Sequence, residues 1–92
     1  MMTFYLMRTS TTMSHLGDYI KKKRKELELT QLEIGNYLGV TNVFVGRVEL
    51  GCCLLPFKHL GKIAQRFDVD KEEVVRLWKK DAIKKINDKL GE

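Results

Sequence analysis

The chain has 92 residues, enough for one domain with a modest core but too few for a catalytic cleft plus a second lobe. With 43% hydrophobic and 32% charged residues, its composition excludes global disorder and a fibrous repeat. A formal net charge of +5 favours a polyanionic partner, although charge alone does not separate nucleic-acid-binding domains from other basic domains.

The cysteine and histidine pattern argues against a metal site. Cys52 and Cys53 are adjacent, and neighbouring thiols pair only through a strained ring, which indicates a reduced, cytoplasmic protein. Together with His15 and His59 they do not reproduce zinc-site spacing, so we expect neither metal nor cofactor. No nucleophile–base pair or phosphate-binding glycine loop appears, so we expect no enzyme. No apolar run approaches membrane-spanning length, so we expect no membrane association.

The first 14 residues are rich in serine and threonine and are predicted to form an extended arm. Three interpretations are open for this arm. It is a frayed terminus, a strand over residues 3–7 that pairs with a partner chain, or upstream sequence if translation begins at Met13.

A first helix is predicted from Leu16 to Leu27, because its apolar residues recur at helical spacing. Arg24 lies four residues after Ile20 and three before Leu27, so it falls on the inward face. A buried guanidinium group needs a carboxylate partner, and we therefore expect one. The lysines around Arg24 are predicted to coat the other faces.

Two short helices joined by a tight turn are predicted next. Thr30 begins a capping box before a helix at residues 31–38. Gly39 can adopt the left-handed conformation that a sharp reversal needs, and Thr41 can cap a second helix at residues 42–50. Gly35 is the small residue expected where these helices cross. The predicted anchors beneath them are Ile34, Leu38, Val40, Val45 and Val48. The residues predicted to face outward are Gln31, Asn42, Val43, Gly46 and Arg47.

Two further helices complete a predicted all-α, five-helix domain. Pro56 suits the first turn of the fourth, whose buried side is Leu60, Ile63, Ala64 and Phe67. Asp70 and Glu73 form a second capping box before the fifth, whose apolar stripe is Val74, Val75, Trp78, Ala82, Ile86 and Leu90. We place the domain at residues 15–78 and a basic helical extension at 79–92. The stripe beyond Trp78 exceeds what the core needs, so either a second subunit or a protein partner covers it, or this stretch is a frayed tail.

The two short helices resemble those of the Cro/C1-type, or XRE-type, helix-turn-helix repressors of phages and bacteria. Residues 30–41 read TQLEIGNYLGVT, and the family pattern is Thr/Ser-Gln-x-x-Leu-Ala-x-x-Leu-Gly-Val-Ser. Residues 47–51 read RVELG, which is similar to the family's Arg-Ile-Glu-x-Gly ending. The resemblance covers roughly residues 16–78 and implies a lambda-repressor-like fold that binds double-stranded DNA.

The resemblance also implies roles for individual residues. Asn42, Val43 and Arg47 match base-facing positions, and their chemistry suits adenine, a thymine methyl group and guanine. Gln31 matches a glutamine that touches a phosphate and steadies the start of the recognition helix. Arg24 and Glu49 match an ion pair that links the first helix to the end of the recognition helix. Supporting positions on the same surface are Thr41, Phe44 and Gly46.

Each of these roles has a simpler alternative. Gln31 could be a solvated polar residue, and Asn42 could merely support the helix cap. Val43 could be an ordinary surface valine, and Arg47 could pair with a neighbouring carboxylate.

The sequence also departs from the family pattern at several positions. Phe44 replaces a usually small residue on the outward side, and Gly46 weakens its helix by about 1 kcal/mol relative to alanine. The loop after Gly51 lacks the family's basic residues, so we expect a weaker hold on phosphates. This loop lies near the family's dimer contact. Leu54, Leu55 and Phe57 are therefore predicted either to contact a second subunit or to cover the core.

The leading functional hypothesis is a transcriptional regulator, a repressor that binds a pseudo-palindromic operator as a homodimer. The alternative is an antitoxin or another protein-interaction module, in which the arm or the C-terminal helix binds a protein and DNA binding is autoregulatory.

Overall fold

The computed structural model describes residues 14–90, with side chains described up to residue 87. The predicted arm over residues 1–14 therefore lies outside the described residues except for Ser14. Within the described part, the protein is all-helical and carries five α-helices and one short 3-10 helix. These are α2 (His15–Glu26), α3 (Gln31–Leu38), α4 (Asn42–Glu49), η2 (Phe57–His59), α5 (Leu60–Phe67) and α6 (Lys71–Leu90).

Polar side chains cap the starts of α2, α3, α4 and α6. The hydroxyl group of Ser14 accepts a hydrogen bond from Gly17 N at 2.8 Å at the start of α2. The predicted capping box at α3 is confirmed, because Thr30 N donates to the Glu33 carboxylate at 2.8 Å and Glu33 N donates to the Thr30 hydroxyl at 3.0 Å. At α6 the predicted capping box between Asp70 and Glu73 is replaced by a simple N-cap. Asp70 accepts from Glu72 N at 3.1 Å, and the Glu73 carboxylate lies 3.9 Å from the Arg76 guanidinium instead.

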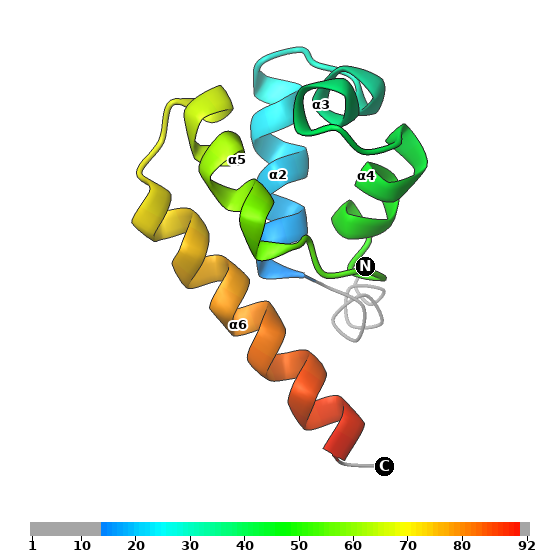
Figure 1. Ribbon diagram of the computed structural model, residues 1–92, viewed down its shortest axis with the longest axis vertical. Helices are drawn as coiled ribbons and strands as arrows, with labels where there is room; N and C mark the ends of the chain where they lie inside the picture. Colours follow the sequence, from blue (N-terminus) through cyan, green and yellow to red (C-terminus); the bar gives the residue numbers. More distant parts are fainter. Residues whose placement is uncertain (1–13, 91–92) are drawn as a thin grey trace, which may run out of the picture.

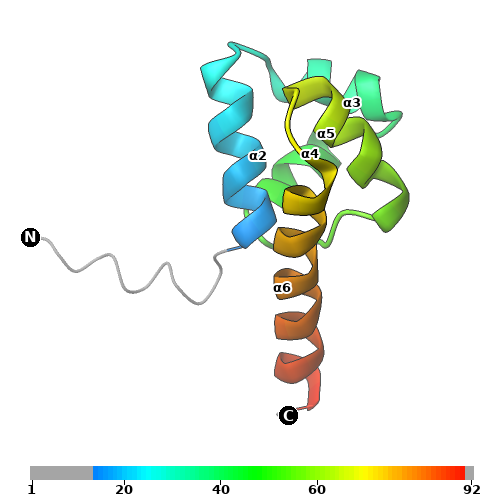
Figure 2. The ribbon, with the colours of Figure 1, turned by 90° about the vertical axis from the view of Figure 1, so that its left-hand side faces the viewer.

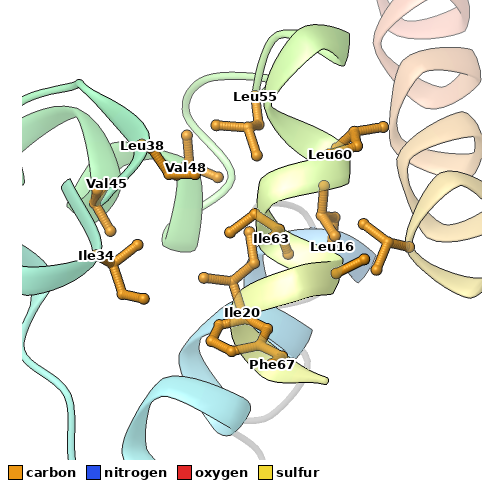
Figure 3. Close-up of a cluster of buried hydrophobic side chains, with 12 residues drawn as sticks. Leu16, Ile20, Ile34, Leu38, Val45, Val48, Leu55, Leu60, Ile63 and Phe67 are labelled. Carbon is orange, nitrogen blue, oxygen red and sulfur yellow. The ribbon is translucent and has the colours of Figure 1, made fainter. Parts of the chain in front are cut away.

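The helices surround one hydrophobic core (Figure 1). In this view α2 stands at the centre, with α3 and α4 on one side and α5 on the other, and α6 runs down from the end of α5. Buried side chains of α3 and α4 point toward those of α2 and α5 (Figure 3). The residues of this core are Leu16, Ile20, Ile34, Leu38, Val45, Val48, Leu55, Leu60, Ile63, Ala64, Phe67 and Val74. The helical spacing of the sequence therefore placed most of the core correctly.

Two helix boundaries differ from the predictions. The first helix ends at Glu26, so Leu27 leaves the apolar face and is exposed. Pro56 does not enter the fourth helix directly. It precedes the 3-10 turn η2, and α5 begins only at Leu60.

The last helix is continuous across the predicted boundary at residue 78. Its first half packs against α2 and α5, and its second half extends past the other helices (Figure 2). Packing continues beyond Trp78 as far as Asp81, which is buried. Beyond Asp81 the stripe residue Ile86 is more than half accessible, and so is Ile83, which lies outside the predicted stripe. In the described residues no helix is both long enough and apolar enough to span a bilayer.

Candidate functional site

The crossing of α3 and α4 is very close. A Cβ atom at Gly35 would lie 2.7 Å from the carbonyl oxygen of Val40, in the turn between the two helices. Gly39, which ends α3, adopts φ = 81°, in the left-handed region that favours glycine. Glycine is therefore required at both positions, for close approach at one and for the turn at the other. This matches the roles predicted for them from the sequence.

A buried ion pair joins α2 to the end of α4. Arg24 Nε donates to Glu49 Oε2 at 2.7 Å, and Arg24 Nη2 donates to Glu49 Oε1 at 3.1 Å. The third arm of the guanidinium group, Nη1, donates to the carbonyl oxygen of Leu29 at 2.8 Å. The hydrogen bond with Glu49 raises the pKa of Arg24 and outweighs burial, which lowers it. The predicted ion pair is confirmed as a contact, and it fixes the end of α4 to the domain.

The same carboxylate also holds Gln31. The amide nitrogen of Gln31 donates to Glu49 Oε1 at 3.1 Å, and the side chain is half-buried. It lies over Gly46, where a Cβ atom would be 3.4 Å from Gln31 Oε1. Gln31 is therefore not merely a solvated polar residue. It braces the middle and end of α4, and not the start of that helix as the resemblance implied.

The opposite side of α4 faces solvent. Asn42, Val43 and Arg47 are all exposed, and Val43 keeps 59% of its accessible surface. The hydroxyl group of Thr41 accepts a hydrogen bond from Phe44 N at 3.1 Å, so Thr41 caps this helix and Asn42 is not needed for that purpose. Among the described residues Arg47 has no ion-pair partner. The alternative interpretations of Asn42 and Arg47 therefore find no contact to support them.

Phe44 was predicted to face outward, and this prediction is wrong. The side chain is half-buried and packs against the hydrophobic core. An aromatic ring gains more from burying its apolar area than from exposure beside polar neighbours, and the position at the edge of α4 allows that burial. Phe44 therefore supports α4 from below and leaves the outward face to its neighbours.

The apolar loop after Gly51 divides between core and surface. Leu55 is only 2% exposed, and its carbonyl oxygen accepts a hydrogen bond from Trp78 Nε1 at 2.6 Å. For Leu55 the core-covering alternative holds, and the residue cannot reach a second subunit. Phe57 remains 52% exposed, with its ring edge-on to Trp78 at a centroid distance of 5.2 Å. Leu54 is half-buried, so it and Phe57 are left as surface residues of this loop.

Cys52 and Cys53 are free thiols in different environments. Cys52 is exposed, whereas Cys53 is half-buried and packs against the core. Over residues 14–90, as far as side chains are described, no group of three or more His, Cys, Asp or Glu residues could hold a metal ion.

One buried polar residue was missed by the sequence analysis. Asp81 is 6% exposed and accepts hydrogen bonds from the Ser14 hydroxyl at 2.5 Å, His15 N at 2.8 Å and Leu16 N at 2.9 Å. His15 Nδ1 lies 3.1 Å from the same carboxylate. A signal was present, because Asp81 lies seven residues after Val74 and so shares its inward face. It was obscured by the surrounding lysines, which resemble a solvated tail.

No family model matches this chain, and no curated protein is significantly similar to it in sequence.

Proposed function

We propose that this protein is a sequence-specific DNA-binding transcriptional regulator, with α3 and α4 as a helix-turn-helix and α4 as the helix that enters the major groove. The observation that carries the proposal is the two-sided character of α4. Val45, Val48 and Glu49 fix one side to the domain, and the other side presents Asn42 and Arg47 to solvent. The motif resemblance over residues 30–51 supports the same assignment.

The chemistry of the exposed side suits base edges. Arginine donates in a fork to guanine O6 and N7, asparagine bonds adenine through two contacts, and a valine methyl group packs on thymine. A free guanidinium at Arg47 is consistent with this use, because its donors have no partner among the described residues. The half-buried amide of Gln31 lies beside this surface, and while one of its N–H groups donates to Glu49, the second is a donor for the proposed phosphate contact.

A gel-shift series tests the proposal. Binding to a selected duplex should fall linearly on a log–log plot as salt rises, because phosphate contacts release counterions. A scrambled duplex of equal length serves as the control and should bind more weakly at every salt concentration. Binding that depends on neither the salt concentration nor the duplex sequence would refute the proposal.

We further propose that the regulator acts as a homodimer on half-sites about one helical turn, ~34 Å, apart. Apolar residues at the surface beside α4 favour this, because Leu50 and Phe57 are exposed and Leu54 is half-buried. In sedimentation experiments the intact chain should form a dimer, and Phe57→Ser should form a weaker dimer. A monomer at all concentrations, with and without operator DNA, would exclude pairing.

A second candidate function rests on the projecting half of α6. Ile83 and Ile86 are 58% and 56% exposed on a helix that extends past the other helices (Figure 2). Such a face is typical of a helix that binds a groove in another protein, as an antitoxin would. Co-purification of a partner that is lost on Ile83→Ser with Ile86→Ser would favour this candidate. The same double variant should leave DNA binding unchanged.

A further inference from the structure

An open groove of about 650 Å³ lies along α5 and reaches the start of α6. Its lining residues include Lys58, Gly61, Lys62 and Gln65. Their spacing along the chain places them on one side of a helix. The buried residues of α5, such as Ile63 and Phe67, belong to the other side. The groove is therefore a surface feature of α5 and α6, separate from the exposed side of α4.

The groove gathers more positive than negative charge. Lys58, Lys62 and Lys71 line it, and Asp68 is the acidic residue among its lining residues. None of the three lysines forms an ion pair with any residue in the described part of the chain. Like charges repel each other, so bringing these three lysines to one site costs free energy.

The position of Lys71 adds to that cost. It is the first residue of α6, where the helix dipole disfavours a cation. Its side chain nevertheless lies over α5, because a Cβ atom at Gly61 would be 3.9 Å from Lys71 Cε and 4.0 Å from Lys71 Nζ. The ammonium group is thus directed into the groove, where an anion would relieve both the dipole and the repulsion.

His59, which follows Lys58 in the chain, responds to two of the same charges. Burial lowers the pKa of His59, and the positive charges of Lys58 and Lys62 lower it further. These two ammonium groups therefore lie close enough to His59 to act on its charge.

We propose that this groove binds a polyphosphate, with Lys58, Lys62 and Lys71 contacting its phosphate oxygens and the Gln65 amide as a neutral donor. Ammonium groups are common phosphate ligands, and 650 Å³ lies within the range of small-molecule sites. The phosphates come either from a free polyphosphate or nucleotide or from the DNA backbone. The second source rests on the proposed function, and the first does not.

Calorimetric titration of the intact chain with inorganic tripolyphosphate tests the site. The variant Lys62→Gln with Lys71→Gln should bind about tenfold more weakly, a loss of ~1.4 kcal/mol. The control variant Lys79→Gln with Lys80→Gln removes the same charge from exposed residues of α6 and should bind as the unmodified chain does. No heat of binding with the unmodified chain, or equal weakening in both variants, would overturn the proposal.

Thermal unfolding keeps this test interpretable. Because the groove lysines repel one another, the groove variant should melt at the same temperature as the unmodified chain or higher. At the same tripolyphosphate concentration, the melting temperature of the unmodified chain and of the control variant should rise more than that of the groove variant. A rise of equal size in all three proteins would contradict the site.

The same variants titrated with a DNA duplex identify the source of the phosphates. If DNA supplies the phosphates, the slope of log binding constant against log salt concentration should be smaller in magnitude by about 1.8 in the groove variant than in the unmodified chain. In the control variant the slope should change less. If a free polyphosphate is the ligand, both variants should bind the duplex alike while only the groove variant loses tripolyphosphate. Failure of the intact chain to bind any duplex would refute the proposed function and leave the tripolyphosphate result unaffected.

Discussion

The Ser14 hydroxyl and the Asp81 carboxylate, 67 positions apart in the chain, form a buried hydrogen bond of 2.5 Å. Ser14 caps α2, so this contact makes Asp81 a second cap on the same helix, supplied by α6. A carboxylate at a helix N-terminus is stabilised by the unpaired N–H groups and by the helix dipole. The contact therefore fixes α6 across α2 and determines the direction in which the rest of α6 projects.

Asp81→Ala should lower the free energy of unfolding by about 2–3 kcal/mol, because it leaves the buried Ser14 hydroxyl and backbone N–H groups without their acceptor. Urea denaturation of the two proteins measures this change. Lys80→Ala, at the exposed neighbouring position, is the matched control and should change stability by less than about 0.5 kcal/mol. Equal stability of Asp81→Ala and the control would show that the cap is not needed.

The same residue predicts a loss of stability in acid. Burial raises the pKa of Asp81, but hydrogen bonds from Ser14, Leu16 and His15 lower it more, so that it falls below its usual 3.8. A carboxyl group with a lowered folded pKa stabilises the fold above the unfolded pKa, and this stabilisation is lost as pH falls through the folded value. We expect the loss below about pH 4. Asp81→Asn should show a smaller fall in melting temperature over that range, and a fall as large as in the unmodified chain would assign the acid sensitivity to other carboxyl groups.

The Arg24–Glu49 pair predicts a strong asymmetry between single and double variants. Arg24→Met leaves the Glu49 carboxylate buried without its cation and should cost about 3–5 kcal/mol. The double variant Arg24→Met with Glu49→Met removes both charges and should recover much of that loss. Denaturant titration of the three proteins completes the cycle. Additive losses in the double variant would mean that the two residues do not interact.

Two glycines give opposite predictions for the same change. Gly46→Ala should stabilise the protein by roughly 0.5–1 kcal/mol, because alanine favours a helix and the new Cβ meets only the end of the Gln31 side chain, 3.4 Å away, an ordinary contact distance. Gly35→Ala should destabilise it, because the new Cβ would overlap the backbone oxygen of Val40. The melting temperatures of the unmodified chain and of the two variants rank the three proteins by stability. If Gly35→Ala is as stable as Gly46→Ala, the crossing of α3 and α4 is looser than described.

Local patterns in the sequence predicted what depends on neighbours along one helix. The helical spacing placed Arg24 on a buried face, and the capping and glycine signals gave the turn between α3 and α4. What was wrong or left open depends on contacts between distant segments. Whether Phe44 turns inward and whether Leu55 belongs to the core are decided by how α4, α5 and α6 pack together, and spacing along one segment cannot show this.

Asp81 shows the same limit from the other side. Its position relative to Val74 marks an inward face, but its partner is a helix start 65 or more residues away. Pairing an isolated acidic residue with a distant helix cap requires the fold first. For Arg24, in contrast, the motif resemblance supplied the identity of the partner.

The proposed use of α4 is tested most directly by selecting duplexes from a random pool with the intact chain and with Arg47→Ala. The intact chain should enrich one site that contains a guanine which Arg47→Ala no longer selects, with a loss of ~1–3 kcal/mol at that position alone. Lys22→Ala changes an exposed residue of α2. It should weaken binding to all sequences without changing the selected site. Enrichment of no sequence, or of the same site with equal preference by Arg47→Ala, would contradict the assignment of α4 as the reading helix.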